Sequence, residues 1–301
     1  MWLLIGGDSE IGAATHQHLK AHGIPCAATT RRKDCVGPDR PFLDLATPLD
    51  DWEPPAGTTA VVVFIAIARI TACDADPQGS AYINVTQTLA LIDRLRKRGI
   101  LVLFLSTNQV FDGSVPNVAP DASPCPVTEY GRQKARTEDA LLSRMGEGAP
   151  IAILRLAKVV APDMPLLRNW IDSLGRGQPI RAFRDMTMAP AETTTVAQAI
   201  TALLKDSAGG IFQLTGPRDL SYFEIGLHLA AKLGADSALI TGSTATAAGL
   251  PAGSARPFTT LASSQLRETY GIAAPDVLEI VDSIVQKKDS GSDRLGRVSK
   301  T

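Results

Sequence analysis

Apolar runs alternate with amphipathic segments through the first half of the chain. The runs, which are typical of buried strands, cover residues 2–5, 24–30, 61–68, 100–106 and 151–155. The segments between them repeat apolar residues at helical spacing and cover residues 11–21, 81–98 and 128–144. Strands separated by helices of this length form right-handed crossover units. The pattern therefore predicts an α/β fold with a doubly wound parallel sheet.

The pattern changes near residue 161. Proline and glycine cluster between residues 162 and 190, and the helices predicted at 196–205 and 222–233 are separated by longer loops. This change predicts a smaller C-terminal α/β lobe. We divide the chain into a nucleotide-binding domain at residues 1–160, a substrate lobe at 161–285 that is partly interwoven with it, and a polar, disordered tail at 286–301.

The composition of the 301 residues argues against several classes of partner. Lys and Arg number 30 against 31 Asp and Glu, so no basic excess favours a nucleic acid. No run approaches the roughly 20 apolar residues of a membrane span, and the start of the chain lacks the features of a signal peptide. The four cysteines form no metal-binding or disulfide pattern, and His18 and His22 lack a third ligand. We expect a cytoplasmic protein without a metal, and without a membrane or nucleic-acid partner.

A glycine-containing loop follows the first predicted strand and opens the first predicted helix. Gly6, Ser9 and Gly12 occupy the three positions of a G-x-x-G-x-x-G dinucleotide loop, with serine replacing the middle glycine. Such a loop needs a tight turn, a close approach of backbone to pyrophosphate, and amide donors at the helix N-terminus. The alternative is an ordinary strand–helix turn. The residues predicted to bind the cofactor here are Gly6, Asp8, Ser9, Glu10, Ile11 and Gly12.

The residues after the second predicted strand favour NADP(H) over NAD(H). In NAD-binding Rossmann folds an acidic residue at this place forms a hydrogen bond with the ribose 2′-hydroxyl, and this chain has no acidic residue there. It has instead Thr30, Arg31 and Arg32, and a guanidinium is suited to a 2′-phosphate. The alternative is a solvated basic loop.

Three residues form a candidate catalytic set. Tyr130 and Lys134 are spaced to lie on one face of a helix, and a nearby ammonium lowers the pKa of a phenol, which makes it a usable general acid. Thr107 ends a predicted strand at the edge where parallel sheets bind ligands, so its hydroxyl is placed to contact a substrate carbonyl. Taken singly, the Tyr-x-x-x-Lys spacing arises by chance on amphipathic helices, and the threonine could cap a strand end.

These motifs resemble the extended short-chain dehydrogenase/reductase family, and within it the dTDP-4-dehydrorhamnose reductase branch. The resemblance rests on Leu-Leu-Ile-Gly-Gly-Asp-Ser-Glu-Ile-Gly at 3–12, Ser-Thr-Asn-Gln-Val-Phe-Asp-Gly at 106–113 and Glu-Tyr-Gly-Arg-Gln-Lys at 129–134. Weaker matches continue to about residue 285, among them Ile-Leu-Arg at 153–155 and Arg-Pro at 256–257. The family has a Rossmann fold with a smaller substrate lobe.

The resemblance implies roles for individual residues. Thr107 would bind the carbonyl, Tyr130 would donate the proton, and Lys134 would tune the tyrosine and hold the nicotinamide ribose. Further cofactor neighbours implied by the family pattern are Asp44, Leu45, Ala66, Ala68, Asn84 and Ser106. A homodimer through the helices that carry Asn84 and Tyr130 is also a family expectation.

The chain departs from the branch where substrate should bind. Asn108-Gln109 replaces the usual Asp-Tyr, and Leu156-Ala157-Lys158 replaces Thr-Ser-Trp. Neither Asn nor Gln can act as acid or base, which argues against the elimination chemistry of the related dehydratases. We predict an NADPH-dependent reductase of a small-molecule carbonyl substrate, a nucleotide-linked 4-keto-deoxysugar or a similar polar ketone. A sugar-nucleotide epimerase and a non-catalytic NADP-binding regulatory subunit remain the alternatives.

Overall fold

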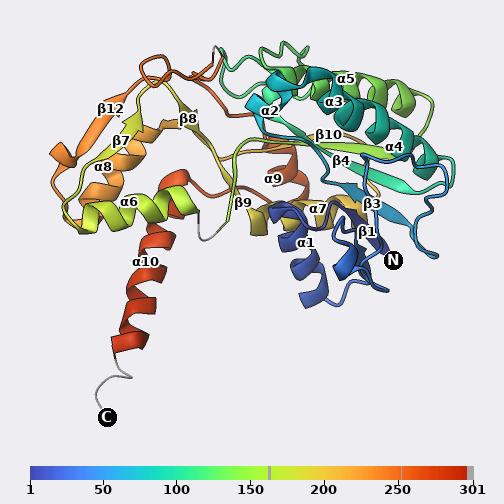
Figure 1. Ribbon diagram of the computed structural model, residues 1–301, viewed down its shortest axis with the longest axis horizontal. Helices are drawn as coiled ribbons and strands as arrows, with labels where there is room; N and C mark the ends of the chain where they lie inside the picture. The colour runs from blue at the N-terminus through green and yellow to red at the C-terminus, as the bar shows by residue number, and fades with distance from the viewer. Residues whose placement is uncertain (162–163, 252, 297–301) are drawn as a thin grey trace.

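Two lobes lie side by side in the computed structural model, which describes residues 1–161, 164–251 and 253–296 (Figure 1). The larger lobe contains a six-stranded sheet in the order β10-β5-β4-β3-β1-β2, and every pair of neighbours is parallel. Its strands are β1 (Trp2–Ile5), β2 (Cys26–Ala28), β3 (Ala60–Val63), β4 (Leu101–Thr107), β5 (Ile151–Leu156) and β10 (Gly210–Leu214). The predicted α/β fold with a doubly wound parallel sheet is confirmed.

Helices cover both faces of this sheet, which explains why its strands are apolar along their whole length. Leu19 of α1 (Glu10–Ala21) and Ile200 of α7 (Thr193–Lys205) pack on one face. Leu91 of α4 (Thr88–Arg96) and Leu141 of α5 (Glu129–Gly146) pack on the other. All seven residues of β4 are buried between these layers. The strand order reverses between β1 and β3, and ligands bind at such a switch point in open α/β sheets.

The third strand is shorter than its apolar run predicts. The run extends to residue 68, but β3 ends at Val63 and residues 64–69 form a loop before α2 (Ile70–Ala75). The loop residues Phe64, Ala66 and Ala68 line the cavities, and Phe64 also packs against the core on one face of the sheet. Apolar character at this position therefore reflects the lining of the cavities rather than a continued strand.

The chain crosses between the lobes more than once. After residue 161, α7, β10 and α9 (Ser264–Tyr270) return to the larger lobe, where α7 packs on α1 and β10 pairs with β5. The smaller lobe is built from α6 (Pro165–Gly175), α8 (Tyr222–Leu233) and the parallel pair β7 (Ile180–Phe183) and β12 (Ile240–Ser243). This interweaving gives the predicted division at residue 160 no simple counterpart, and that division stays a prediction.

The remaining elements connect these parts. Short strands are β6 (Val159–Val160), β8 (Thr187–Met188), β9 (Ala191–Glu192) and β11 (Leu220–Ser221), and α3 (Pro77–Ala81) leads into α4. The last helix, α10 (Val277–Gly296), packs its first turns on α6 and α8 and then extends away from the body (Figure 1). Residues 297–301 of the predicted tail lie outside the described residues.

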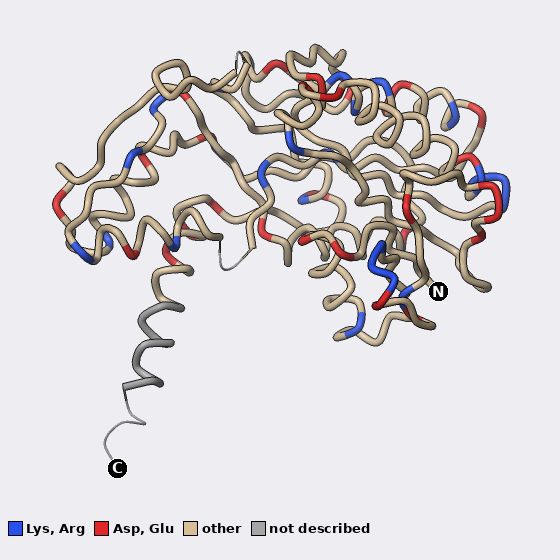
Figure 2. Tube along the Cα trace, viewed as in Figure 1, with Lys and Arg blue, Asp and Glu red and all other residues tan. Residues whose placement is uncertain are grey.

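Charged residues of both signs are spread over both lobes (Figure 2). Within the described residues, no helix is long and apolar enough to cross a membrane. Those residues also contain no cluster of three or more His, Cys, Asp or Glu side chains placed to hold a metal ion.

Candidate active site

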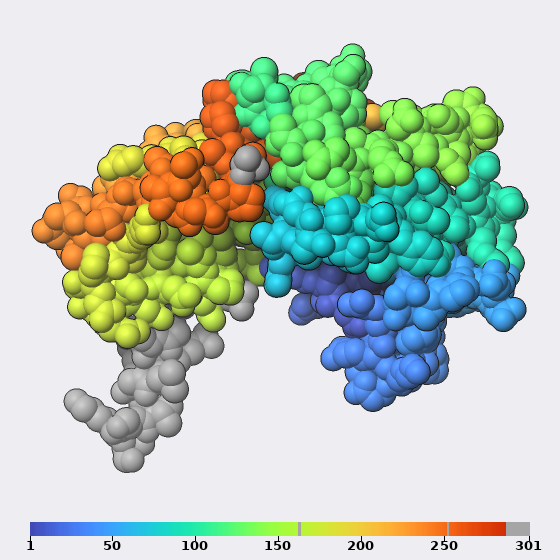
Figure 3. Space-filling view, turned by 45° about the horizontal axis from the view of Figure 1, so that its top comes forward, coloured from blue at the N-terminus to red at the C-terminus, as the bar shows by residue number. Residues whose placement is uncertain are grey.

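Two adjoining cavities open at the carboxyl ends of the central strands, and the lobes meet along a seam visible in Figure 3. The larger cavity, of about 630 Å³, is lined by Thr107 at the end of β4, Tyr130 on α5 and residues of the smaller lobe such as Tyr222. The smaller cavity, of about 520 Å³, lies against the loop after β1 and residues 43–46. Ser9, Phe64, Ala66 and Ala68 contact both, so the two form one continuous site.

The glycines of the first loop are required by their surroundings. Gly6 has a φ of +94°, a conformation that side chains disfavour. A Cβ on Gly12 would lie 2.5 Å from the Gly6 carbonyl oxygen, and one on Gly7 would lie 2.5 Å from the Ala28 Cβ. Helix α1 therefore starts in close contact with β1 and β2. This is the packing that a dinucleotide loop needs to bring its amides to a pyrophosphate.

The serine at the middle position serves as the N-cap of α1. Ser9 has an ordinary extended backbone, its Oγ accepts a hydrogen bond from Gly12 N (3.1 Å), and its hydroxyl donates to Gly6 O (2.8 Å). The backbone N–H groups of Glu10 and Ile11 belong to the first turn, which has no intrahelical partners for them. The substitution thus fits the loop without strain, and the helix keeps amide donors for an anion.

Asp8 organises the basic loop after β2. Its carboxylate accepts hydrogen bonds from the Thr30 hydroxyl (2.7 Å) and Arg31 N (3.3 Å) and forms ion pairs with Arg32 (3.4 Å) and Arg40. Burial alone would raise the pKa of Asp8, but these hydrogen bonds and cations together lower it. The Arg31 side chain contacts the smaller cavity and is not paired with Asp8. Arg40 had no recognisable signal in the sequence.

The structure brings most predicted site residues together. Those that line the larger cavity are Ser9, Glu10, Ile11, Ala66, Ala68, Ser106, Thr107, Tyr130 and Lys134. Those that line the smaller cavity are Gly6, Asp8, Ser9, Arg31, Asp44, Leu45, Ala66 and Ala68. Four predicted residues line neither cavity, namely Gly12, Thr30, Arg32 and Asn84. The first three support the loops described above.

Tyr130 and Lys134 lie on one face of α5, but their electrostatics differ from the prediction. Lys134 is buried, its ammonium donates to Leu105 O (2.7 Å) and lies 4.2 Å from the Phe104 ring centroid. Burial lowers the pKa of Lys134 to about 7. Burial, with the nearby Cys73, raises the pKa of Tyr130 above its usual value. The predicted lowering of the Tyr130 pKa is therefore not found, and the phenol holds its proton at neutral pH.

Thr107 ends β4 at the start of a tight turn. Its hydroxyl oxygen accepts from Gln109 N (3.2 Å), and the turn is held from the other lobe by Arg256. The buried Arg256 guanidinium donates to the Gln109 side chain and to Phe111 O, while the Asn108 amide donates to Thr259 O (3.2 Å). Asn108 and Gln109, the two residues that depart from the family pattern, thus connect the loop at 253–259 to the turn after β4.

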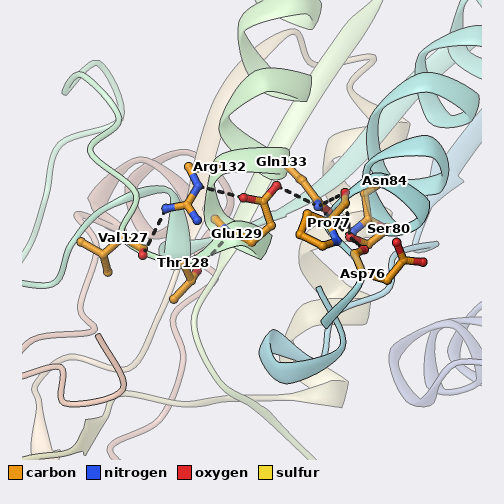
Figure 4. Close-up of polar contacts among 10 residues, drawn as sticks. Asp76, Pro77, Ser80, Asn84, Val127, Thr128, Glu129, Arg132 and Gln133 are labelled. Atoms are coloured by element: carbon orange, nitrogen blue, oxygen red, sulfur yellow. Dashed lines mark hydrogen bonds and ion pairs between the residues drawn. The ribbon is translucent and has the colours of Figure 1, made fainter. Parts of the chain in front are cut away.

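Asn84 lines neither cavity and lies in a π-helical segment, η2 (Tyr82–Gln87). Its side chain accepts from Ile67 N (2.7 Å) and donates to Ile67 O (3.0 Å), which fixes the loop between the two cavities. It also donates to the buried Gln133 (2.7 Å), which in turn donates to Ser80 (2.8 Å) and Glu129 (3.1 Å) (Figure 4). Asn84 therefore ties the helix of Tyr130 to the cavity loop.

A buried ion pair connects α5, the helix that carries Tyr130, to strand β5. Arg155 of β5 and Glu138 of α5 are each 1% exposed, and their closest atoms are 2.7 Å apart. The guanidinium also donates to Pro120 O (2.9 Å) and Gln213 (3.2 Å). Breaking such a pair by removing one partner leaves an uncompensated buried charge. The Ile-Leu-Arg string therefore has a structural explanation.

Nearly the whole chain, including both cavities, resembles one known protein family. The model of the RmlD substrate binding domain matches residues 1–290. The chain belongs to this family. The match runs through the glycine loop, the Tyr130 helix and the smaller lobe, so both cavities lie inside it.

The individual proteins that are similar to this chain share less than 30% of its residues in the aligned regions. A dTDP-4-keto-6-deoxy-D-glucose reductase from Streptomyces niveus is 27% identical over 237 residues, covering 78% of this chain and 79% of that protein. Methionine adenosyltransferase 2 subunit beta from Xenopus tropicalis is 24% identical over 227 residues, covering 72% of this chain and 62% of that protein. A dTDP-4-dehydrorhamnose reductase from Bacillus anthracis, solved in complex with NADP, has a TM-score of 0.77 at 15% identity and covers 95% of this chain and 98% of that one.

Proposed function

We propose that this protein reduces the ketone of a nucleotide-linked sugar, or a similar polar ketone, with NADPH. The observation that carries the proposal is the convergence of Thr107, Tyr130 and Lys134 on the larger cavity, next to a cavity that suits a dinucleotide. The related reductase from Streptomyces niveus acts, by its name, on a 4-keto-6-deoxy sugar nucleotide. That the substrate of this protein is likewise a nucleotide-linked ketosugar is part of the proposal.

The residues of the smaller cavity fit NADP(H). The close packing at Gly7 and Gly12 places the start of α1 against the cavity, and Ser9 adds a cap without a clash. Arg31 supplies a guanidinium at the cavity wall that is free to meet a 2′-phosphate. The cofactor would supply the hydride when it is bound.

The chain's own residues would handle the carbonyl and the proton. The Thr107 hydroxyl and the Tyr130 phenol would both donate hydrogen bonds to the carbonyl oxygen and so favour hydride attack. Tyr130, whose pKa is raised by burial, carries the proton that the developing alkoxide needs. The Lys134 ammonium, one turn further along α5, would stabilise the phenolate that remains.

The proposal is tested with the Tyr130→Phe variant, since it removes the proton donor and keeps the ring. We expect turnover of a nucleotide-linked 4-ketosugar to fall by about 10²–10⁴-fold, the usual contribution of a general acid. NADPH binding, followed by the fluorescence of the cofactor, should be retained. Tyr270→Phe, at a tyrosine that donates to Asp206 away from the cavities, is the matched control. Undiminished turnover in Tyr130→Phe would contradict the mechanism.

A regulatory subunit is the second candidate, favoured by the relative from Xenopus tropicalis, whose name describes a subunit of methionine adenosyltransferase 2. Such a role would retain NADPH binding without any loss of NADPH when ketosugars are added. Size-exclusion chromatography of the protein with methionine adenosyltransferase would then show a complex. Consumption of NADPH with a ketosugar and no complex would support the reductase.

A further inference from the structure

The substrate end of the larger cavity carries one lysine without a partner in the protein. Lys158 lines this cavity, is exposed, and has no carboxylate within 4.0 Å among the described residues. Its backbone is fixed, because Ala191 N donates to Lys158 O (2.9 Å). The side chain is therefore anchored at its base and has a free ammonium at its end.

The two other cations of the cavity, Lys134 and Arg256, donate hydrogen bonds to protein acceptors, although the Arg256 Nε has no partner among the described residues. Lys134 is buried under the turn and donates to Leu105 O. The Arg256 guanidinium donates to the Gln109 side chain and to the carbonyls of Phe111 and Asn108. Glu10, at the first turn of α1, is the only carboxylate among the lining residues and lies at the cofactor end. The substrate end thus has an excess positive charge that the protein does not neutralise.

The position of Lys158 places this charge near the carbonyl that would react. Leu156 pairs with Thr107 across β5 and β4, and Lys158 follows two residues later, about 7 Å of extended chain. A lysine side chain spans a similar length, so its ammonium can reach a group attached close to the carbonyl held by Thr107. Met186, Met188 and Tyr222, which line the same end, offer no charge to compete with it.

We propose that Lys158 binds an anionic group, such as a carboxylate, on the sugar of the substrate, close to the reacting ketone. This proposal rests on the proposed reductase function and narrows its substrate class from nucleotide-linked sugars in general to those that carry an anionic group on the sugar. It makes Lys158 a residue for specificity: its charge selects the substrate and takes no part in proton transfer. The group bound by Lys158 is on the sugar and is distinct from the diphosphate that every nucleotide-linked sugar carries.

The test compares three probes on the NADP⁺-saturated protein by calorimetry. The probes are UDP-glucuronate, which carries a sugar carboxylate, UDP-glucose, which lacks it, and UDP alone. The proposal predicts that the wild-type protein binds UDP-glucuronate about fivefold more tightly than UDP-glucose, as expected for one partly exposed ion pair. Lys158→Met should abolish this preference while the affinity for UDP-glucose stays within about twofold, and Lys158→Arg should retain it. Lys97→Met, at an exposed lysine after α4, is the control.

Two results would overturn the proposal. An equal loss of affinity for all three probes in Lys158→Met would assign the lysine to the diphosphate, and an absent preference in the wild-type protein would show that it has no anionic partner on the sugar. Either result leaves the reductase function standing if NADPH is consumed with a neutral 4-ketosugar. Failure of the wild-type protein to bind NADPH would instead refute both. A wild-type protein that binds NADPH but none of the three probes would overturn the Lys158 proposal alone.

Discussion

The two cavities of this protein are built in different ways. The smaller cavity draws its residues from positions 6–83, from short segments that follow neighbouring strands, and it presents glycine-shaped backbone and a few polar groups. The larger cavity draws on residues from Ser9 to Thr259 and on both lobes. A cofactor common to many enzymes can be bound by local backbone geometry. A particular substrate needs side chains collected from the whole chain, and these differ between relatives.

The largest effect on cofactor binding should come from filling the close contact in the glycine loop. In Gly12→Ala the new Cβ would lie 2.5 Å from Gly6 O, and this backbone atom has little freedom to move. Because overpacking costs about 1–3 kcal/mol, the Kd for NADPH should rise by up to about a hundredfold in a fluorescence titration. Gly146→Ala, where a Cβ meets nothing within 4 Å, should leave it unchanged. Equal affinity in the two variants would mean that the smaller cavity does not depend on this packing.

The second prediction concerns Lys134, the buried lysine that lines the larger cavity. The pKa of Lys134 is about 7 in the folded protein and near 10.5 unfolded, so the unfolded chain binds more protons between these values and stability rises with pH there. Lys134→Met removes this dependence. Its stability advantage over the wild type should therefore be largest below about pH 7 and should shrink by about 2 kcal/mol by about pH 9.

Urea unfolding of both proteins across this pH range measures the difference. Lys97→Met, at an exposed position, should run parallel to the wild type at every pH. Parallel curves for Lys134→Met as well would show that the buried lysine keeps its charge at high pH.

Features that depend on local sequence can be predicted from the sequence, whereas features that depend on contacts between distant residues cannot. The bounds predicted for α8 at residues 222–233 are confirmed, because Ser221 and Glu224 form a capping box and Gly234 ends the helix in the left-handed conformation. The glycine loop and strands β1 to β5 of the large sheet, apart from the carboxyl end of β3, are predicted for the same reason, since their determinants are local. Where each predicted site residue binds remains a prediction, although most of these residues line the two cavities.

Long-range features escaped prediction. Arg256 contacts Gln109 across 147 residues of sequence, and neither residue type signals the other. The apolar run at 61–68 predicts one strand, because the pattern of apolar residues cannot distinguish a residue buried under a helix from one that lines a cavity. Burial raises the pKa of Tyr130 instead of lowering it, and it lowers the pKa of Lys134, whose ammonium packs against Leu105 O and the Phe104 ring of β4. Helical spacing alone does not reveal this packing.

A third prediction separates the larger cavity from the smaller one. Gln109→Ala removes an acceptor from the buried Arg256 guanidinium and loosens the loop at 253–259 that lines the substrate end. Since a hydrogen bond to a charged group is worth about 1.5–3 kcal/mol, KM for the ketone should rise by about tenfold or more. The Kd for NADPH should stay within about twofold, because Gln109 lies outside the smaller cavity. Gln17→Ala, on the exposed face of α1, is the control. A matching rise in the NADPH Kd would show that the two cavities are not independent.

The smallest effect should distinguish the arginines of the basic loop. Arg31 contacts the smaller cavity, whereas Arg32 is paired with Asp8 and does not line it. Arg31→Gln should therefore weaken NADPH binding by about fivefold, the value of one partly exposed charge pair, and leave NADH binding unchanged. Arg32→Gln is the matched control and should change the ratio of the two Kd values less, because its charge is already engaged by the Asp8 carboxylate. A larger effect of Arg32→Gln would mean that Asp8 presents Arg32 to the 2′-phosphate. The discrimination between the two cofactors would then depend on the ion pair rather than on the arginine at the cavity wall.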